Sequence, residues 1–441
     1  MIRMPVRSPG SVTNKKNTLL ESLKVITMEC CPTVPSIVVR NLKWRSTGGR
    51  VRRVSVLGRP NVTGLILLTL FVMSSFFVLD LTFPWNSTNG NGLPMLSPGC
   101  DLFTGSWVYD ETYPLYTNCS FAEPGFRCAE NGRSDLRYRN WRWQPRDCNM
   151  PRFNALDMLT RLRNKRIAFI GDSMGRTQWE SLICLLLAGV SDKTQVKETN
   201  GRTITKTAPH LAVWFPGFNV TVEYYRSPWL VQMSRPPRHT PRRVVSTLKL
   251  DTLELISRKW QAAEVLIFNT GHWWTTTKTY RSGCYFQIGS SIRLGMKMEE
   301  AYRIAVATWA AWVNEQLNPD VTHVFFRSFE PSHWLRKACL NSSLPLTNQT
   351  HIYPLEQHMQ AGVLDNVWET LHVRATLLNI TTLSSFRPDG HIFNYSRRGS
   401  PLDCAHWCLP GVPDIWNEQL YALFLLRASG RANSQEIKRL F

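Results

Sequence analysis

The clearest hydrophobic pattern in the chain is a run of four apolar residues, 167–170, that follows the charged pair Lys165 and Arg166. A short apolar run of this kind is typical of a strand buried on both faces. Gly171 marks a turn after it, and apolar side chains then recur at helical spacing over residues 175–187. The pattern therefore predicts a buried strand, a tight turn and a helix.

Similar patterns continue along the rest of the chain. Two further apolar runs, 265–268 and 321–326, predict buried strands, and residues 203–225 alternate between apolar and polar side chains as strands do. Helical patterns cover residues 150–163, 299–317 and 414–426. Because strands and helices alternate, we expect an α/β fold with a largely parallel sheet flanked by helices.

Polar residues follow the end of each predicted buried strand. Ser173 comes after the first strand, residues 269–272 after the second and residues 327–333 after the third. In sheets of this kind, binding and catalytic sites gather at the C-terminal ends of the strands. We therefore expect a functional site at this edge of the sheet.

Residues 60–79 carry no charge, and most of them from Gly64 onwards are apolar. Twenty residues of helix span about 30 Å, which is enough to cross a bilayer. Five arginines between positions 45 and 59 precede the run and Asp80 follows it, which places the N-terminal side in the cytosol and the rest in a lumen or outside the cell. A cleaved signal peptide is the alternative, but the long basic lead and the lack of a small-residue cleavage site argue against it.

The segments around this predicted anchor differ in composition. Residues 1–59 hold twelve Lys or Arg and two acidic residues without periodicity, which predicts a disordered basic cytosolic tail. A stem linker over 80–99 and a C-terminal tail over 429–441 are also expected. Residues 100–150 are dense in cysteine, tryptophan and turn residues and predict a small disulfide-held lobe, whereas residues 151–428 form the predicted α/β domain.

Cysteines and sequons agree with a lumenal or extracellular location for the part beyond the anchor. Nine of the eleven cysteines lie there, and an oxidising compartment would pair them with at least one left free. Sequons for N-glycosylation begin at Asn86, Asn118, Asn219, Asn341, Asn348, Asn379 and Asn394.

The charge of the chain indicates the kind of partner it suits. The 441 residues carry a formal net charge of +20, of which the part beyond residue 59 contributes half. A basic surface attracts acidic partners. Seventeen tryptophans suit a carbohydrate-binding surface, although tryptophan also fills cores.

Ser173 lies at the predicted strand-to-helix turn, within the string Gly171-Asp172-Ser173. The first N–H groups of a helix are unpaired there and can stabilise a developing oxyanion. A serine at this turn is thus a candidate nucleophile. The alternative is that Ser173 only caps the helix.

The second stretch with candidate catalytic residues is Asp403-Cys404-Ala405-His406-Trp407-Cys408. A serine hydroxyl needs a base to remove its proton and a third group to orient that base. Asp403 and His406 are three residues apart, so the carboxylate can accept the imidazole N–H on one turn and leave the other ring nitrogen for Ser173. A solvated aspartate and a buried histidine are the alternative. The flanking cysteines would fix this irregular segment if each is joined to a distant element, whereas a direct Cys404–Cys408 bridge would brace only the turn.

Six motifs carry a family resemblance: Cys-Asp-Leu-Phe-Thr-Gly-Ser-Trp at 100–107, Trp-Arg-Trp-Gln-Pro at 141–145, Phe-Ile-Gly-Asp-Ser at 169–173, Asn-Thr-Gly-His-Trp-Trp at 269–274, Phe-Arg-Pro-Asp-Gly-His at 386–391 and Asp-Cys-Ala-His-Trp-Cys-Leu-Pro-Gly-Val-Pro-Asp at 403–414. Over roughly residues 99–428 the chain resembles the plant trichome birefringence-like family of polysaccharide O-acetyltransferases, which is related to the Gly-Asp-Ser-Leu esterases.

This resemblance implies an SGNH-hydrolase-like fold in a single-pass type II Golgi membrane enzyme, with Ser173, His406 and Asp403 as its triad. It also implies the disulfides Cys100–Cys148, Cys119–Cys184, Cys128–Cys408 and Cys339–Cys404, with Cys284 free. One segment departs from the family, which usually has Gly-Gly where Arg336-Lys337-Ala338 precede Cys339. The departure concerns the loop beside the acceptor site and leaves the triad untouched.

The expected reaction is a two-step acyl transfer through acetyl-Ser173, with His406 as the base in both steps. Backbone N–H groups after Gly171 are the expected oxyanion donors, Asn269 or Arg176 would assist, and Asp172 supports the turn. The candidate residues of the substrate groove are His272, Trp273, Arg327, His333, Asp389 and His391. A structural role is the alternative for His272 and His391.

The expected partners follow from this chemistry. An acetyl donor is required, either acetyl-CoA or an acetylated intermediate supplied by a partner protein, and no bound cofactor is expected. The basic lumenal part favours an acidic acceptor such as pectin or glucuronate-bearing xylan, although xyloglucan and mannan remain open. No nucleic-acid partner is expected. A metal site is not expected either, because His333 with Cys339, and Cys404 with Cys408, lack a four-ligand spacing.

Two other functions compete with this interpretation. One is a polysaccharide acetylesterase with the same triad, in which water instead of a sugar hydroxyl accepts the acetyl group. The other is a non-catalytic protein that binds and bridges pectin. An intact set of Ser173, Asp403 and His406 argues against a pure binder, since binding needs none of the three.

Overall fold

The structure is a computed structural model that describes residues 100–334, 338–347, 359–396 and 401–428. The predicted cytosolic tail, membrane anchor, stem and C-terminal tail lie outside these residues. All described elements belong to one unit of the chain, Asn89–Phe441. Within the described part, no helix is long and apolar enough to span a membrane.

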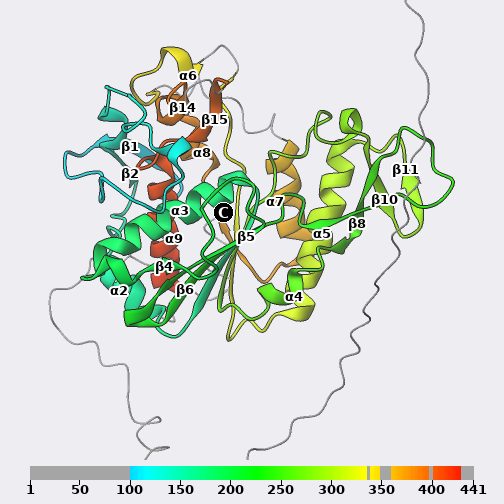
Figure 1. Ribbon diagram of the computed structural model, residues 1–441, viewed down its shortest axis with the longest axis horizontal. Helices are drawn as coiled ribbons and strands as arrows, with labels where there is room; N and C mark the ends of the chain where they lie inside the picture. Colours follow the sequence, from blue (N-terminus) through cyan, green and yellow to red (C-terminus); the bar gives the residue numbers. More distant parts are fainter. Residues whose placement is uncertain (1–99, 335–337, 348–358, 397–400, 429–441) are drawn as a thin grey trace, which may run out of the picture. The chain divides into compact units, whose positions relative to one another are not determined.

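The centre of the fold is a seven-stranded sheet with the order β13-β12-β9-β3-β6-β5-β4 (Figure 1). The five strands from β13 to β6 run parallel, whereas β5 and β4 extend one edge of the sheet with antiparallel pairing. The fold is therefore a mixed α/β sheet with a parallel centre. Its strands are β3 (Arg166–Gly171), β4 (Lys197–Glu198), β5 (His210–Phe215), β6 (Val220–Arg226), β9 (Val265–Phe268), β12 (His323–Arg327) and β13 (Thr376–Leu378).

Each face of this sheet has its own hydrophobic core, because alternate side chains of a strand point to opposite faces. Ile167 and Phe169 of β3 pack with the helices α2, α3 and α9. Ala168 and Ile170 pack with α5 and α7 on the other face, and Figure 1 shows the two groups of helices on opposite sides of the strands. The helices are α2 (Ala155–Arg161), α3 (Ser173–Leu186), α4 (Ser257–Trp260), α5 (Met298–Gln316), α6 (Ala338–Asn341), α7 (Met359–Leu371), α8 (Thr381–Ser385) and α9 (Val412–Ala428).

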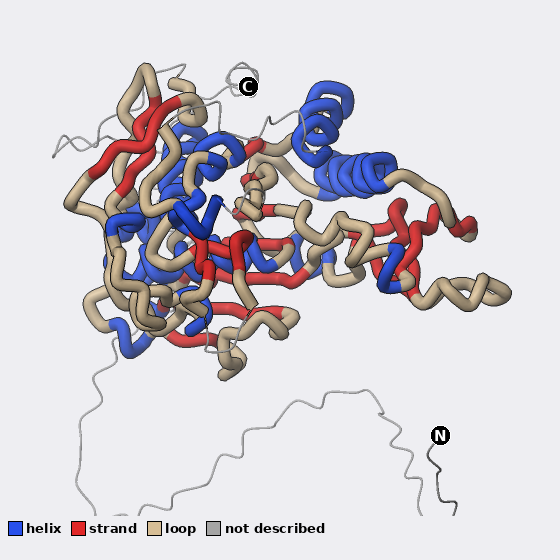
Figure 2. Tube along the Cα trace, turned by 90° about the horizontal axis from the view of Figure 1, so that it is seen from above, coloured by secondary structure: helices blue, strands red, loops and turns tan. Residues whose placement is uncertain are grey.

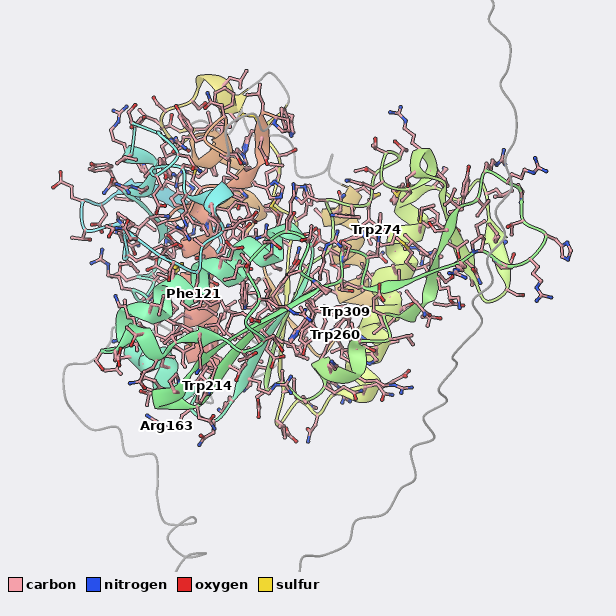
Figure 3. The ribbon with its side chains drawn as sticks, viewed as in Figure 1. Phe121, Arg163, Trp214, Trp260, Trp274 and Trp309 are labelled. Carbon is pink, nitrogen blue, oxygen red and sulfur yellow. A yellow bond between two sulfur atoms is a disulfide. The ribbon has the colours of Figure 1, made fainter. Side chains whose placement is uncertain are left out.

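Tryptophans fill much of the core beside α5. Trp260 and Trp309 each meet the ring of Phe268 on β9 edge-on, with ring centroids 5.6 and 5.4 Å apart. Figure 3 labels both tryptophans. Trp274 lies in the same core against Tyr302 of α5. These three tryptophans therefore fill the core and do not form a carbohydrate-binding surface.

A second sheet, with the order β11-β10-β8-β7, lies next to α5 (Figure 2). Its strands β8 and β10 are parallel, and the two outer pairings are antiparallel. Nothing in the sequence patterns above predicts this sheet. Its strands are β7 (Val231–Ser234), β8 (Ser246–Leu253), β10 (Cys284–Ile288) and β11 (Ser291–Arg293).

The cysteine-rich segment that begins at residue 100 contains one antiparallel pair, β1 (Gly105–Tyr109) and β2 (Trp141–Pro145). Its apolar side chains belong to the same core as α3 and α9. Two of its polar contacts reach α9: the Tyr113 hydroxyl donates to Glu418 at 2.9 Å, and Gln419 donates to the carbonyl of Leu102 at 3.0 Å. The segment is thus packed directly onto the helices beside β3.

Most predicted elements occur with shifted ends. The helix predicted from residue 175 begins two residues earlier, at Ser173, and the helix predicted over 150–163 is shortened to α2. The strands expected within 203–225 form the antiparallel pair β5 and β6, so this part of the sheet is not parallel. The segment of His406, expected to be irregular, is the short strand β15 (Asp403–Trp407), which pairs with β14 (His391–Phe393) across a register shift.

Candidate active site

Three side chains from distant parts of the chain form a continuous hydrogen-bonded array. The Oγ of Ser173 lies 2.7 Å from Nε2 of His406, and Nδ1 of His406 lies 2.8 Å from Oδ2 of Asp403. In this arrangement the imidazole donates to the carboxylate through Nδ1 and accepts the serine proton at Nε2. The order of nucleophile, base and orienting acid is that of a Ser-His-Asp triad.

The turn between β3 and α3 places Ser173 at the first position of the helix. The residue that caps α3 is Asp172, whose Oδ1 accepts the N–H of Met174 at 3.0 Å. Ser173 is therefore not the cap, and its side chain is free to contact His406. The preceding carbonyls of Gly171 and Asp172 are held by the N–H of Ser227 at 2.8 Å and the Tyr224 hydroxyl at 3.0 Å.

Asn269, the first residue after β9, packs against this turn from the neighbouring strand. A side-chain carbon on Gly171 or Gly175 would lie about 2 Å from Oδ1 of Asn269, at 2.0 and 2.1 Å. Both positions therefore need glycine, because the amide occupies the space of a side chain. The Nδ2 of Asn269 donates to Oδ1 of Asp172 at 2.7 Å, so Asn269 supports the turn.

Asp403 is held by backbone as well as by the histidine. Its Oδ1 accepts the N–H groups of Ala405 and His406 at 2.9 and 2.8 Å, which holds the carboxylate in place beside the His406 ring. Burial alone would raise the pKa of Asp403, but these hydrogen bonds and the charge of His406 outweigh burial and lower the pKa well below its ordinary value. The carboxylate is thus ionised wherever the protein is folded at ordinary pH.

Disulfides anchor both ends of β15. Cys404 is joined to Cys339 of α6, and Cys408 is joined to Cys128 in the cysteine-rich segment. The remaining disulfides are Cys100–Cys148 and Cys119–Cys184, so the four pairs are those that the resemblance implied, and Cys284 is free and buried on β10. Since Cys404 and Cys408 each reach a distant element, the local Cys404–Cys408 bridge does not occur.

Ser173, Asp403 and His406 line a cavity of 660 Å³. Phe126 forms part of its wall and stacks on the His406 ring, with centroids 6.0 Å apart and planes 24° apart. The other lining residues are Glu123, Gly125, Asp172, Met174, Arg176, Lys206, Thr207, Tyr224, Arg226, His272, Trp273, Lys278, Ile392, Ser396 and Ala405.

Arg176, an expected oxyanion assistant, lines the cavity but is already paired. Its guanidinium contacts Glu123 at 2.6 Å and also Glu180, and it lies over the ring of Phe126. Asn269, the other expected assistant, is not among the lining residues. Both side chains therefore support neighbouring groups instead of offering a free donor at the cavity wall.

Two of the predicted groove residues, His272 and Trp273, line the cavity. The Nε2 of His272 lies 2.9 Å from a carboxylate oxygen of Glu330. Burial opposes the charged imidazole, but the charge of Glu330 and its hydrogen bond outweigh burial and raise the pKa of His272. His272 is thus positioned by an acid behind it.

The other four predicted groove residues, Arg327, His333, Asp389 and His391, do not line this cavity, which corrects the prediction. Each is no more than 2% exposed. They satisfy one another or nearby groups, as buried charged and polar residues must.

Arg327 pairs with Glu330, and Asp389 accepts two hydrogen bonds from Arg387 at 2.8 and 2.9 Å. His333 contacts His391 at 2.6 Å between ring nitrogens, and His391 holds the carbonyl of His406 at 3.0 Å. These residues therefore support the segment of the histidine base from behind.

Three cationic residues of the cavity wall, Lys206, Arg226 and Lys278, were not singled out by the sequence patterns. Each is an exposed residue that belongs to none of the motifs described above, so the sequence alone does not distinguish it from other surface cations. Phe126 was missed for a similar reason, although its place two residues before Cys128 could have suggested a position close to His406.

The sequons fall in different environments. Asn118, Asn219 and Asn394 are exposed, and Asn379 is half-buried with its Oδ1 accepting from Ser328 at 3.3 Å. Asn86 and Asn348 lie outside the described residues, and the Asn341 side chain is not described. In the described ranges, no group of three or more His, Cys, Asp or Glu side chains is arranged to hold a metal ion.

Comparison with known proteins finds two family matches, which meet between residues 149 and 150. Residues 150–423 match a family described as the GDSL/SGNH-like acyl-esterase family found in Pmr5 and Cas1p, and residues 98–149 match the PMR5 N-terminal domain. The first of these matches covers more than half of the chain.

Similar curated proteins come from Arabidopsis thaliana. The chain is 48% identical over 331 residues to trichome birefringence-like protein 7, covering 74% of each chain. It is 40% identical over 384 residues to trichome birefringence-like protein 9, covering 82% of this chain and 92% of that relative. The protein named trichome birefringence is 38% identical over 356 residues, covering 76% and 58%.

These matches agree with the mixed α/β sheet. A GDSL/SGNH-like acyl-esterase domain indicates an enzyme that transfers or hydrolyses acyl groups. The chain therefore belongs to the trichome birefringence-like family, with a GDSL/SGNH-like acyl-esterase domain over residues 150–423.

Proposed function

We propose that the protein is an O-acetyltransferase that transfers acetyl groups to hydroxyls of a plant cell-wall polysaccharide through an acetyl-Ser173 intermediate. The observation that carries the proposal is the array in which Ser173 Oγ lies 2.7 Å from His406 Nε2 and His406 Nδ1 lies 2.8 Å from Asp403 Oδ2. A hydroxyl at this distance from an imidazole nitrogen that accepts its hydrogen bond can lose its proton as it attacks.

In the first step, His406 accepts the proton of Ser173 while Oγ attacks the carbonyl carbon of the acetyl donor. The bond between that carbon and the donor's leaving group breaks, and His406 returns the proton to the leaving group. In the second step, a sugar hydroxyl gives its proton to His406 and attacks the acetyl-Ser173 carbonyl. The ester bond to Ser173 breaks, and Oγ recovers its proton from His406.

Both steps place a negative charge on the carbonyl oxygen of the acetyl group. The N–H of Ser173 lies in the first turn of α3, where helix N–H groups have no intrahelical partner. The N–H of Met174 is already bound by Asp172, and among the described residues no acceptor contacts the N–H of Ser173. We assign the Ser173 N–H as an oxyanion donor, assisted by the positive end of the α3 dipole.

Asp403 has a positioning and electrostatic role in this scheme. Its lowered pKa keeps it charged, so it fixes the tautomer in which His406 carries hydrogen on Nδ1 and presents Nε2 to the serine. It also stabilises the imidazolium that forms when His406 takes a proton. Asp403 itself does not exchange a proton in either step.

The proposed location is the Golgi membrane, with the catalytic domain in the lumen. Residues 60–79 form the proposed single-pass type II anchor, and the basic tail before them lies in the cytosol. The four disulfides support an oxidising compartment for the described part, because such bonds rarely persist in the cytosol. The sequons at exposed Asn118, Asn219 and Asn394 are proposed to carry glycans there.

An acetylesterase is the second candidate. With the same triad, water can attack acetyl-Ser173 in place of a sugar hydroxyl and release acetate. The 660 Å³ cavity beside Ser173 has room for water molecules, each of which takes about 30 Å³ in the liquid. The test incubates the purified full-length protein with an acetyl donor, with and without deacetylated xylan, pectin, xyloglucan or mannan oligomers. Acetyl groups on one oligomer, with little free acetate, support the transferase. Acetate release that no oligomer suppresses supports the esterase.

The wild-type protein and the Ser173→Ala variant separate either enzyme from a binding protein. If the protein only binds and bridges pectin, both forms retain the same oligomers on a column and neither transfers or releases acetate. A catalytic protein loses both activities in the Ser173→Ala variant while its fold persists.

A further inference from the structure

Three cationic side chains project into the same cavity as the triad without an acidic partner. Lys206, Arg226 and Lys278 line the cavity and are exposed, and none of them forms an ion pair with any described residue. They come from three places in the fold: the loop between β4 and β5, the end of β6, and the segment after β9.

The acidic groups of the cavity are already engaged. Glu123 contacts Arg176, Asp172 caps α3, and Asp403 holds His406. None of these three acids forms an ion pair with Lys206, Arg226 or Lys278, so the three cations remain available to an anionic ligand beside the nucleophile.

An indole ring organises two of these cations. The guanidinium of Arg226 lies 5.3 Å and the ammonium of Lys278 lies 4.8 Å from the centre of the Trp273 ring. A cation is attracted to the face of an aromatic ring, yet the ring does not neutralise it or occupy its N–H donors as a carboxylate would. Trp273 is fixed in turn by an edge-on contact with Trp229 at 5.7 Å. Arg226 and Lys278 are thus each held against the Trp273 ring with their donors available.

We propose that Lys206, Arg226 and Lys278, with Trp273 between the last two, form a subsite for the carboxylate of a uronic acid residue in the acceptor polysaccharide. The guanidinium of Arg226 can bind a carboxylate through two parallel hydrogen bonds, and the two lysines of the same cavity add positive charge. This inference rests on the proposed transferase function and names the acceptor class: a polymer that carries a carboxylate near the hydroxyl to be acetylated.

The phosphate groups of an anionic acetyl donor could bind the same three cations. The experiment must therefore vary the donor and the acceptor separately. The uronate assignment is favoured because the three cations lie on separate segments and are exposed. A polymer that continues beyond the cavity can contact all of them at once.

The test compares two acceptors of equal length: oligogalacturonate, and the same oligomer with its carboxyl groups reduced to alcohols. Transfer by the full-length protein is measured as kcat/KM for each acceptor with a donor that lacks phosphate, and the KM of a phosphate-bearing donor is measured separately. The variant Lys206→Gln/Arg226→Gln/Lys278→Gln is compared with Arg293→Gln/Lys297→Gln/Arg303→Gln, which loses the same charge at exposed positions outside the cavity.

We expect the wild type to prefer the acidic oligomer. The cavity variant should lower the ratio of the two kcat/KM values at least about tenfold, since each lost charged hydrogen bond costs about that factor or more. The control variant should retain the preference. Added salt should weaken the preference of the wild type because it screens exposed charges.

Three results would overturn the subsite. They are equal transfer to both oligomers by the wild type, an equal loss for both in the cavity variant, and a change confined to the KM of a phosphate-bearing donor. Each of these leaves acetyl transfer itself intact. An absence of transfer to every acceptor would instead contradict the proposed function.

Discussion

The side-chain amide of Asn269 donates a hydrogen bond of 2.7 Å to Asp172, the residue that caps the helix of the nucleophile. The same Oδ1 of Asp172 accepts the N–H of Met174, so one carboxylate joins the end of β9 to the first turn of α3. Because Asn269 also fills the space beside Gly171 and Gly175, the position of Ser173 depends on a residue that does not line the catalytic cavity.

The variant Gly175→Ala tests this dependence. The added methyl carbon would lie 2.1 Å from Oδ1 of Asn269, so either the amide or the helix must move. We expect a loss of about 1–3 kcal/mol in the free energy of unfolding, as for other overpacked sites, together with a fall in kcat. Thermal unfolding and transfer kinetics measure the two effects.

Gly362→Ala is the matched control for this substitution. Gly362 lies in α7 with open space around its side-chain position, so alanine there should raise stability slightly through helix propensity. The double variant Gly175→Ala/Asn269→Ala should lose less stability than the sum of the two single variants, because truncation of Asn269 makes room for the methyl group. Strictly additive losses would contradict the proposed packing.

Two disulfides of equal sequence separation allow the support of His406 to be separated from general stability. Cys339–Cys404 and Cys119–Cys184 each join residues 65 positions apart, but only the first is attached to β15. On the chain-entropy estimate, loss of either should cost about 4 kcal/mol. We expect Cys339→Ser/Cys404→Ser to lower kcat much further than Cys119→Ser/Cys184→Ser.

This comparison uses kcat at a temperature where both double variants remain folded, as judged by circular dichroism. Mild reduction of the wild type should likewise abolish transfer before the core unfolds. Equal losses of kcat in the two variants would mean that the disulfide beside His406 stabilises the whole fold without positioning the base.

Two buried acids of α9 make the stability of the protein depend on pH. Burial raises the pKa of Asp414 and the pKa of Glu418 to about 7 each, whereas the unfolded chain has values near 4. The folded state therefore holds protons that unfolding releases between about pH 4 and pH 7. The contribution of these two acids to stability should be largest below this window and should fall as pH rises through it, by on the order of 3 kcal/mol per group.

The variant Asp414→Asn/Glu418→Gln should flatten this decline. The hydroxyls that contact the two acids, Ser181, Tyr116 and Tyr113, can accept as well as donate, so neutral amides are tolerated there. Denaturant unfolding of the wild type, this variant and the exposed control Asp320→Asn at pH 5 and pH 8 measures the difference. An unchanged slope in the double variant would assign the pH dependence to other groups.

The proposed topology has a direct test in sealed microsomes. A protease added outside should remove only about the first 59 residues, because the run at 60–79 would span the bilayer and the described domain would lie inside. Immunodetection of tags at each end reports the products. Protection of the N-terminal tail together with digestion of the C-terminal domain would reverse the orientation.

The sequence predicted those parts of the fold and site that depend on local pattern. The apolar run before Gly171 and the helical spacing after it predict β3 and α3. The separation of three residues between Asp403 and His406 predicts the contact of their side chains. The second sheet was not predicted, because β8 and β10 pair in parallel across thirty residues or more and neither strand indicates its partner.

The prediction of the substrate groove was wrong for four residues that are buried and contact other polar residues instead of lining the cavity. Arg327 lies three residues before Glu330, and Arg387 two residues before Asp389, so each ion pair was available as a local signal. The contact between His333 and His391 had no such signal, because it joins segments 58 residues apart. Exposed cations such as Arg226 were not predicted as site residues, because only the fold shows that they line the same cavity.

The central claim is that Ser173 carries the acetyl group. The most direct measurement mixes the full-length protein with an isotope-labelled acetyl donor, stops the reaction in acid and locates the label by peptide mass spectrometry. We predict one labelled site, Ser173, in the wild type and in the control Ser396→Ala, which alters another serine of the same cavity. Ser173→Ala should carry no label and transfer nothing, and Asp403→Asn should be labelled orders of magnitude more slowly because His406 takes the wrong tautomer. Label on another residue, or full transfer by Ser173→Ala, would contradict the triad.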